Sequence, residues 1–221
     1  MSIEKNTYLY TYAVTRDFGF APNPFHGLCT LATCKPKIRK SAKVNDWVMG
    51  IGGSKLKSVK RKCIFIMKVS EVLSFQQYWE DKRFGLKKPQ RNGTQVKMLG
   101  DNIYHRCRSG SWMQEDSHHS NEDGSPNLTN LNRDTGTTDH VLISDYFLYF
   151  GSTAKSIDLE AINYGKVRDY KKTDLSHTQK ARELISHMFT EHRSEKNMVL
   201  ADPCQFVYSH KRVDQGTNKI L

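Results

Sequence analysis

The chain has 221 residues, of which 37% are hydrophobic, and it carries a formal net charge of +11 at pH 7. Its ten Phe, ten Tyr and three Trp residues can fill one sizeable core, which excludes a wholly disordered chain. No run of about eighteen apolar residues occurs, and the first residues lack the apolar centre of a signal peptide. We therefore expect a single soluble, cytoplasmic domain over residues 1–221, without membrane contact.

Five cysteines are present, namely Cys29, Cys34, Cys63, Cys107 and Cys204. Their odd number and the lack of a Cys-x-x-Cys pair argue against a disulfide framework and a zinc ribbon. His26 lies close to Cys29 and Cys34, but a structural zinc ion needs four ligands at tight spacing. We expect free thiols and no metal site.

The first half of the chain reads mainly as strands. Residues 7–16 are rich in Tyr, Thr and Val, which indicates a strand, and residues 17–25 form a rigid loop with two prolines. That loop carries Phe18, Phe20 and Phe25, which either stack on a base or fill the core. Residues 44–51 and 63–72 read as two further strands, joined by a basic connection.

The second half contains the predicted helices. Ser74 and Gln77 form a capping-box pattern, which predicts a helix that ends near Gly85. Residues 141–150 are nearly all apolar and indicate one central buried strand. Residues 173–192 have apolar side chains at helical spacing and predict a second helix. The expected fold is α+β, with a mixed or mainly antiparallel sheet and peripheral helices.

Charge is distributed unevenly along the chain. Residues 35–68, the basic window, contain eleven basic residues and one acid, giving +10, whereas residues 114–139 contain six acids and one Arg, giving −5. A basic window of this density attracts phosphates. The alternative is a solvated basic surface.

A long polar stretch, residues 100–134, holds the side chains that are best suited to acid–base or ligand-binding chemistry. Glu115, Asp116 and either His118 or His119 could act as general acid and base. Neighbouring side chains in an extended segment point to opposite faces, so we expect only one of the two histidines to face a ligand. The alternative is an ordered loop whose Asp, Asn and Ser side chains bond only backbone groups. No phosphate-binding glycine loop and no Ser or Cys nucleophile motif is recognisable.

Several blocks together resemble a phage and bacterial family, the second type of nucleotide-modification-associated domain. The blocks are TRDFGFAPNPF (15–25), CTLATCKPKIRKSAKVNDWVMGIGG (29–53), GDNIY (100–104), QEDSHHSNEDGSPN (114–127) and VLISDYFLYFG (141–151). The resemblance covers about residues 8–151, and residues 152–221 read as a C-terminal helical extension. It implies a role in DNA base or nucleotide modification.

The polar residues that match this signature are Arg16, Asp17, Asn23, Asp101, Asn102, Tyr104, Glu115, Asp116, Ser117, His118, His119, Ser120, Asp123, Ser125 and Asn127. A weaker, architectural similarity is to PUA-like barrels of the ASCH and EVE groups. It rests on the turn-and-strand pattern of residues 43–48, in which Asn45 replaces a glycine. It implies a partly closed barrel that binds nucleic acid.

We therefore expect a protein that binds a nucleotide or an extruded base. The basic window, including Lys43, would contact phosphates, and aromatic side chains would stack on the base. The candidates for stacking are Phe18, Phe20, Trp47, Tyr104 and Trp112. Residues 116–127 would contact the polar edge of the base, with Asp116 and His118 as proton-transfer groups. Three alternatives stay open: a base-modifying enzyme, a non-catalytic reader of modified nucleic acid, and a phage or defence protein that sequesters a nucleotide. No motif indicates a cofactor.

Overall fold

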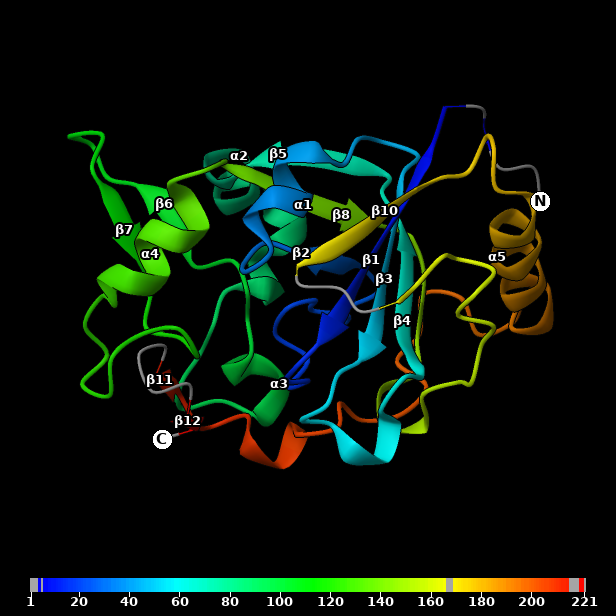
Figure 1. The fold of residues 1–221 in the computed structure, drawn as a ribbon. Helices are drawn as coiled ribbons and strands as arrows, with labels where there is room; N and C mark the ends of the chain where they lie inside the picture. The colour runs from blue at the N-terminus through cyan, green and yellow to red at the C-terminus, as the bar shows by residue number, and fades with distance from the viewer. Residues whose placement is uncertain (1–3, 5, 166–168, 215–218, 221) are drawn as a thin grey trace.

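A computed structural model describes residues 4, 6–165, 169–214 and 219–220, and it has an α+β architecture (Figure 1). A five-stranded mixed sheet has the order β10 (Tyr170–Asp174), β1 (Tyr8–Val14), β3 (Trp47–Gly52), β4 (Cys63–Lys68) and β9 (Tyr146–Tyr149). The pair β1–β3 is parallel, and the other neighbours are antiparallel. The predicted α+β class and mixed sheet are therefore confirmed.

Three smaller antiparallel sheets accompany it. The first has the order β2 (Cys29–Leu31), β8 (His140–Ser144) and β5 (Glu71–Ser74). The others are the hairpin of β6 (Tyr104–Arg106) with β7 (Trp112–Gln114) and the pair of β11 (Val213–Asp214) with β12 (Lys219–Ile220). In the described part of the chain no sheet closes on itself, so the expected PUA-like barrel is wrong.

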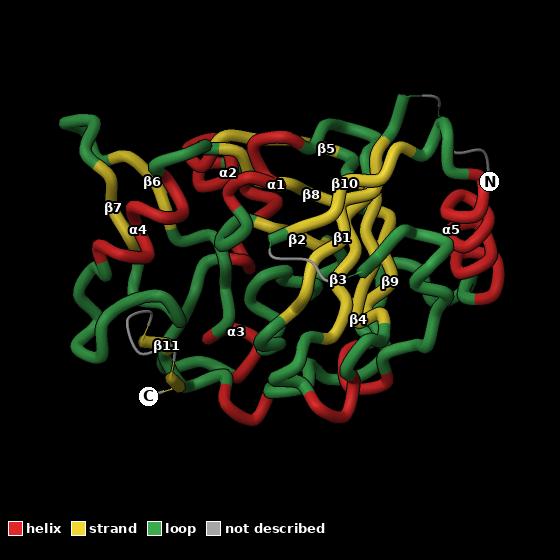
Figure 2. Tube along the Cα trace, in the orientation of Figure 1, coloured by secondary structure: helices red, strands yellow, loops and turns green. Residues whose placement is uncertain are grey.

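The helices surround these sheets (Figure 2). The α-helices are α1 (Pro36–Ser41), α2 (Phe75–Glu80), α3 (Gln95–Met98), α4 (Leu128–Thr135) and α5 (Gln179–Glu191). The 3-10 helices are η1 (Lys57–Val59), η2 (Lys82–Lys87), η3 (Gly151–Thr153) and η4 (Phe206–Tyr208). Among the described residues, no helix has both the length and the apolar character that crossing a bilayer requires.

Both faces of the large sheet are buried. On one face, Leu9, Trp47 and Met49 pack with the apolar side of α5. On the other face, Tyr10 and Tyr12 pack with residues of β2 and α1. A third cluster, which includes Phe18, lies toward the end of the molecule where α2, α4 and the β6–β7 hairpin gather, away from α5 (Figure 1).

The apolar run 141–150 is not one strand, as the sequence predicted. It forms β8 and β9, which belong to different sheets and are separated at Asp145. The run 63–72 divides in the same way into β4 and β5, with Val69 and Ser70 between them. Since β4 pairs with β9 and β5 pairs with β8, the two segments pass together from one sheet to the other. β4, β8 and β9 are mostly buried and β5 is half-buried, so hydropathy alone does not reveal the break.

The two predicted helices form, but with different limits. The capping box at Ser74 is present, whereas α2 ends at Glu80 and η2 follows after Asp81. The C-terminal helix begins at Gln179 rather than near Thr173, because residues 170–174 pair with β1 as strand β10. Its predicted apolar positions Ala181, Ile185, Met188 and Phe189 are buried.

The capping box predicts a measurable contribution to stability. The Ser74 hydroxyl accepts a hydrogen bond from Gln77 N at 3.1 Å, and the Gln77 side chain accepts one from Ser74 N at 2.8 Å. We expect Ser74→Ala to lower the free energy of unfolding in urea by about 1 kcal/mol. Ser58→Ala, an exposed position in η1, is the control and should stay within about 0.5 kcal/mol of the parent. If Ser74→Ala and Ser58→Ala lowered the free energy of unfolding equally, the capping box would not be a specific source of stability.

Candidate functional site

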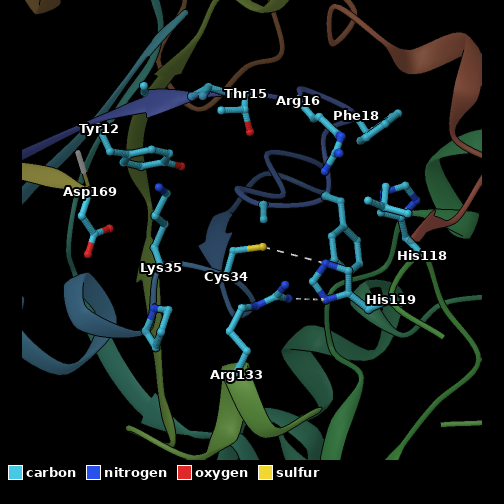
Figure 3. Close-up of a pocket in the computed structure, with 16 residues that line it drawn as sticks. Tyr12, Thr15, Arg16, Phe18, Cys34, Lys35, His118, His119, Arg133 and Asp169 are labelled. Carbon is cyan, nitrogen blue, oxygen red and sulfur yellow. Dashed lines mark hydrogen bonds between the residues drawn. The ribbon is translucent and has the colours of Figure 1, made fainter. Parts of the chain in front are cut away.

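A pocket of about 350 Å³ opens mainly between four segments of the chain, and Asp169 and Val213 also line it (Figure 3). The end of β1 and the loop after it contribute Tyr12, Arg16 and Phe18, and the turn before α1 contributes Cys34 and Lys35. The other two segments are a turn that carries His118 and His119, and helix α4, which provides Arg133. Its volume is in the range of small-ligand sites.

The turn before α1 has an unusual backbone. Cys34 and Lys35 have φ values of 58° and 40°, in the left-handed region that residues other than glycine rarely occupy. Two hydrogen bonds hold this turn: Cys34 N donates to Asp134 Oδ1 at 2.9 Å, and Arg39 Nε donates to Cys34 O at 2.8 Å. The constrained turn presents both side chains to the pocket (Figure 3).

Cys34, His119 and Asp134 form a connected row of side chains. His119 Nε2 lies 3.8 Å from Cys34 Sγ, and His119 Nδ1 donates to Asp134 Oδ2 at 3.1 Å. Asp134 is fully buried, and it also accepts hydrogen bonds from Arg133 at 2.9 and 3.0 Å and from the Tyr104 hydroxyl at 3.0 Å. A thiol, an imidazole and an orienting carboxylate in this order make up the arrangement that activates a cysteine nucleophile.

The charges around Cys34 favour its thiolate. Burial alone would raise the pKa of the Cys34 thiol, but the positive charge of Arg133 and the hydrogen bond from His119 outweigh burial and lower it. Burial would likewise lower the pKa of His119, but its hydrogen bonds to Asp134 and Cys34 raise it. These directions favour a thiolate–imidazolium pair.

Cationic side chains dominate the polar part of the pocket. Arg16, Lys35 and Arg133 line it, whereas Asp169 is the carboxylate among the lining residues. The Lys35 ammonium lies 4.7 Å from the centre of the Tyr12 ring. Burial lowers the pKa of Lys35, opposed by the charges of Cys34 and Asp169. Several cations beside aromatic rings suit an anionic, aromatic ligand.

The expectation that His118 and His119 point to opposite faces is wrong. Both line the pocket, because the segment is a turn in which Ser120 N bonds Ser117 O at 3.1 Å rather than an extended chain. The His118 ring lies 4.5 Å from that of Phe18 and donates through Nδ1 to Lys211 O at 2.6 Å. Burial, followed by the charge of His119, lowers the pKa of His118 to about 3, so this imidazole is neutral at pH 7.

The predicted carboxylates Glu115 and Asp116 do not line the pocket. Glu115 accepts a hydrogen bond from His105 Nε2 at 2.8 Å, and Asp116 pairs with Arg212. The structure therefore does not place Asp116 together with His118 as a proton-transfer pair.

Most other signature residues bond within the protein. Asp17 accepts hydrogen bonds from the Tyr149 hydroxyl and from Cys204 N. A second buried network joins Asn23, Lys87, Asp101 and Asn102 to neighbouring backbone and hydroxyl groups. These residues lie outside the pocket and connect its supporting segments.

The residues of the loop 117–127 order that loop. Ser117 Oγ accepts a hydrogen bond from His119 N at 3.2 Å, and Asp123 accepts hydrogen bonds from Ser125. Asn127 caps α4 by accepting a hydrogen bond from Asn130 N at 3.0 Å. The Asn, Asp and Ser side chains of this loop therefore stabilise its conformation through local hydrogen bonds.

The aromatic candidates divide between the pocket and the core. Phe18 and Phe20 are only 4% and 3% exposed, and part of each lines the pocket. Phe25 belongs to the same buried cluster. Trp47 packs against Phe189 of α5 on the opposite side of the large sheet. Trp112 packs edge-on against Phe75.

The basic window does not form one surface. Lys43 is exposed in the turn before β3, whereas helix η1 lies on the opposite side of the molecule from α1 in this view (Figure 1). Arg39 is fully buried and donates to three backbone carbonyl oxygens. Of the window's basic residues, Lys35 lines the pocket.

Cys34, Arg133 and Asp134 were not among the predicted site residues. Cys34 is 85 residues from His119 in sequence, and no motif joins them. The available signals were weak: a cysteine two residues before Pro36, and an Arg-Asp pair at the end of the polar stretch. Within the residues that the structure describes, no group of three or more His, Cys, Asp or Glu side chains is arranged to hold a metal ion.

Comparison with known proteins identifies the family. The family model described as nucleotide modification associated domain 2 matches residues 6–210, which include α5 and every residue that lines the pocket except Val213. Comparison with curated proteins and with solved structures returned no match. Because the family model covers most of the chain, the protein belongs to the nucleotide modification associated domain 2 family.

Proposed function

We propose that this pocket binds a single nucleotide in a phage or bacterial nucleotide-modification system. The observation that carries the proposal is the grouping of Arg16, Lys35 and Arg133 around a cavity with aromatic walls. Guanidinium and ammonium groups recognise phosphate oxygens, and aromatic faces recognise bases. The family's association with nucleotide modification agrees with this ligand class.

The ligand is either a free nucleotide or one nucleotide extruded from nucleic acid. A cavity of about 350 Å³ accepts a single nucleotide rather than a duplex. A nucleic-acid substrate would therefore have to present an extruded or unpaired nucleotide. If the protein is a non-catalytic reader or a nucleotide-sequestering protein, it binds the ligand in the same pocket and carries out no reaction.

Two measurements test this proposal. Native mass spectrometry of the purified protein should detect a retained nucleotide, and titration calorimetry should rank mononucleotides against short single-stranded oligonucleotides. Preference for mononucleotides indicates a free substrate, whereas preference for oligonucleotides indicates an extruded one. Failure of both ligand classes to bind would overturn the proposal.

Replacement of Lys35 should weaken nucleotide binding. We expect Lys35→Gln to raise the Kd for the best mononucleotide about tenfold, because one charge-assisted contact is lost. Lys55→Gln is the matched control, since Lys55 is an exposed lysine of the same basic window that does not line the pocket. Its Kd should stay unchanged. An equal effect of both substitutions would indicate non-specific attraction by net charge.

A further inference from the structure

Cys34 differs from the other cysteines of the protein in its surroundings. Cys29 and Cys63 are fully buried, and burial raises the pKa of each thiol. Cys107, on the β6–β7 hairpin, does not line the pocket. Cys34 lines it and points toward His119, whose Nε2 lies 3.8 Å from Cys34 Sγ (Figure 3). A thiol beside an imidazole in an open pocket is suited to act as a nucleophile.

Three cations lie around this thiol. Burial raises the pKa of Cys34, and the charge of Arg133 is the strongest influence that opposes burial. Burial lowers the pKa of Arg16 and of Lys35, and in both cases the charge of Cys34 opposes that effect. An anionic substrate held by Arg16 and Lys35 therefore lies against Cys34. Arg133 is placed to stabilise negative charge that develops at the reacting centre.

The position of His119 indicates which electrophile suits this cluster. The cations alone do not distinguish a carbonyl from a phosphoryl group, because they stabilise negative charge on either. In displacement at phosphorus, the leaving group departs in line with the nucleophile and opposite to it, away from a proton donor beside the sulfur. At a carbonyl group, the sulfur and the leaving group are bonded to one tetrahedral carbon, so an imidazole beside the sulfur also reaches the leaving group. A single imidazole 3.8 Å from Sγ therefore favours acyl transfer.

We propose that Cys34 is the catalytic nucleophile of an acyl hydrolysis in this pocket, with His119 as the catalytic acid and base. The substrate is a nucleotide that carries an acyl group as an ester or an amide, and this choice of substrate rests on the proposed function. Asp134 is a positioning residue, because it accepts the hydrogen bond from His119 Nδ1 at 3.1 Å and so directs Nε2 toward the sulfur.

The reaction balances with water as the second reactant. The thiolate electron pair forms a bond to the carbonyl carbon, and the C=O electron pair moves to the oxygen. When the carbonyl re-forms, the bond to the leaving oxygen or nitrogen breaks, and that atom takes the proton of the His119 imidazolium. The neutral imidazole then takes a proton from water as water attacks the thioester, the S–C bond breaks and the thiolate–imidazolium pair is restored. The products are a carboxylic acid and a nucleotide with a free hydroxyl or amino group.

Two chromogenic probes with the same leaving group test this reaction. 4-Nitrophenyl acetate should give a burst of 4-nitrophenol and then steady hydrolysis, with the acetyl group located on Cys34 by peptide mass spectrometry. We expect steady hydrolysis to fall about a hundredfold or more in Cys34→Ser and in His119→Gln. The control Cys107→Ser should retain the parental rate, since Cys107 does not line the pocket. 4-Nitrophenyl phosphate should not be hydrolysed.

The pH dependence of the burst distinguishes a catalytic His119 from a merely structural one. Burial raises the pKa of Cys34, and Arg133 and the hydrogen bond from His119 lower it. In His119→Gln the burst should therefore require a higher pH than in the parent. An unchanged pH profile would overturn the role of His119. Should Cys34→Ser not fold, alkylation of Cys34 by iodoacetamide in Cys107→Ser, located by peptide mass spectrometry, must abolish hydrolysis.

Calorimetry with mononucleotides separates this inference from the proposed function. A mononucleotide that binds the pocket should slow acetylation of Cys34 as it approaches saturation, and undiminished acetylation would overturn a nucleotide as the substrate. Three results overturn the acyl role of Cys34 and leave nucleotide binding intact: acetylation without turnover, turnover unchanged in Cys34→Ser, or Cys34-dependent hydrolysis of the phosphate probe alone. Turnover of the acetate probe without binding of any nucleotide overturns the proposed function and the nucleotide substrate together.

Discussion

Replacing Asp134 by Asn is expected to lower the free energy of unfolding by about 3–5 kcal/mol. The Asp134 carboxylate is fully buried and accepts hydrogen bonds from Arg133, His119, Tyr104 and Cys34 N. Despite burial, its pKa is lowered by the hydrogen bond from His119 and by the charges of His119 and Arg133, so the native group is ionised. The Asn side chain would place its NH₂ donor against some of these donors, and it would remove the negative charge that balances Arg133 and His119.

Urea denaturation at pH 7 measures this effect. The matched control is Asp123→Asn, because Asp123 is an exposed acid of the same polar stretch that accepts hydrogen bonds from nearby Ser125. We expect the control to change stability by less than about 0.5 kcal/mol. Tyr104→Phe removes one donor and should cost about 1 kcal/mol. A loss below about 1 kcal/mol in Asp134→Asn would show that the stability of the protein does not depend on the Asp134 charge.

Acidification should destabilise the protein through His118. Its imidazole is 2% exposed, and burial and the charge of His119 lower its pKa to about 3, with Arg91 and Arg16 acting in the same direction. In the unfolded chain a histidine titrates near about 6.5. Between these two pH values the unfolded state binds a proton on His118 and the folded state does not. The neutral imidazole therefore contributes its full stability above a pH of about 6.5, and this contribution is lost as the pH falls through about 3.

The loss attributable to His118 should reach about 4–5 kcal/mol over this range. It is measured as the difference in the pH dependence of unfolding between the parent and His118→Phe, which preserves an aromatic ring beside Phe18. His187→Phe is the control, since the His187 side chain is 75% exposed on α5. We expect a flatter profile in His118→Phe alone. Parallel profiles for the parent and His118→Phe would contradict the buried neutral imidazole.

Local interactions made several elements predictable. The capping box at Ser74 depends on side chains three residues apart, and the apolar face of α5 depends on helical spacing. The first strand follows from its Tyr, Thr and Val content. The family resemblance was also available from the sequence, because its blocks occur in order along the chain.

Other features depend on pairing that the sequence does not display. The break between β8 and β9 arises because β8 joins β2 and β5 while β9 joins β4, and both strands consist mainly of apolar residues. Residues 170–174 are polar enough to suggest the start of a helix, but they pair with β1 at the sheet edge. In each case a distant partner determines the conformation.

The candidate site was also only partly predictable from the sequence. Composition and charge indicated a polar, functional stretch around His118 and His119, and both histidines line the pocket. Their neighbours Glu115 and Asp116 turn toward surface partners instead, because the chain bends at Ser117–Ser120. The thiol, the imidazole and the carboxylate come from residues 34, 119 and 134, which meet where α1 and α4 pack together. Spacing along a chain predicts contacts only within one helix or strand, so a site assembled from three separate segments becomes visible in the folded protein alone.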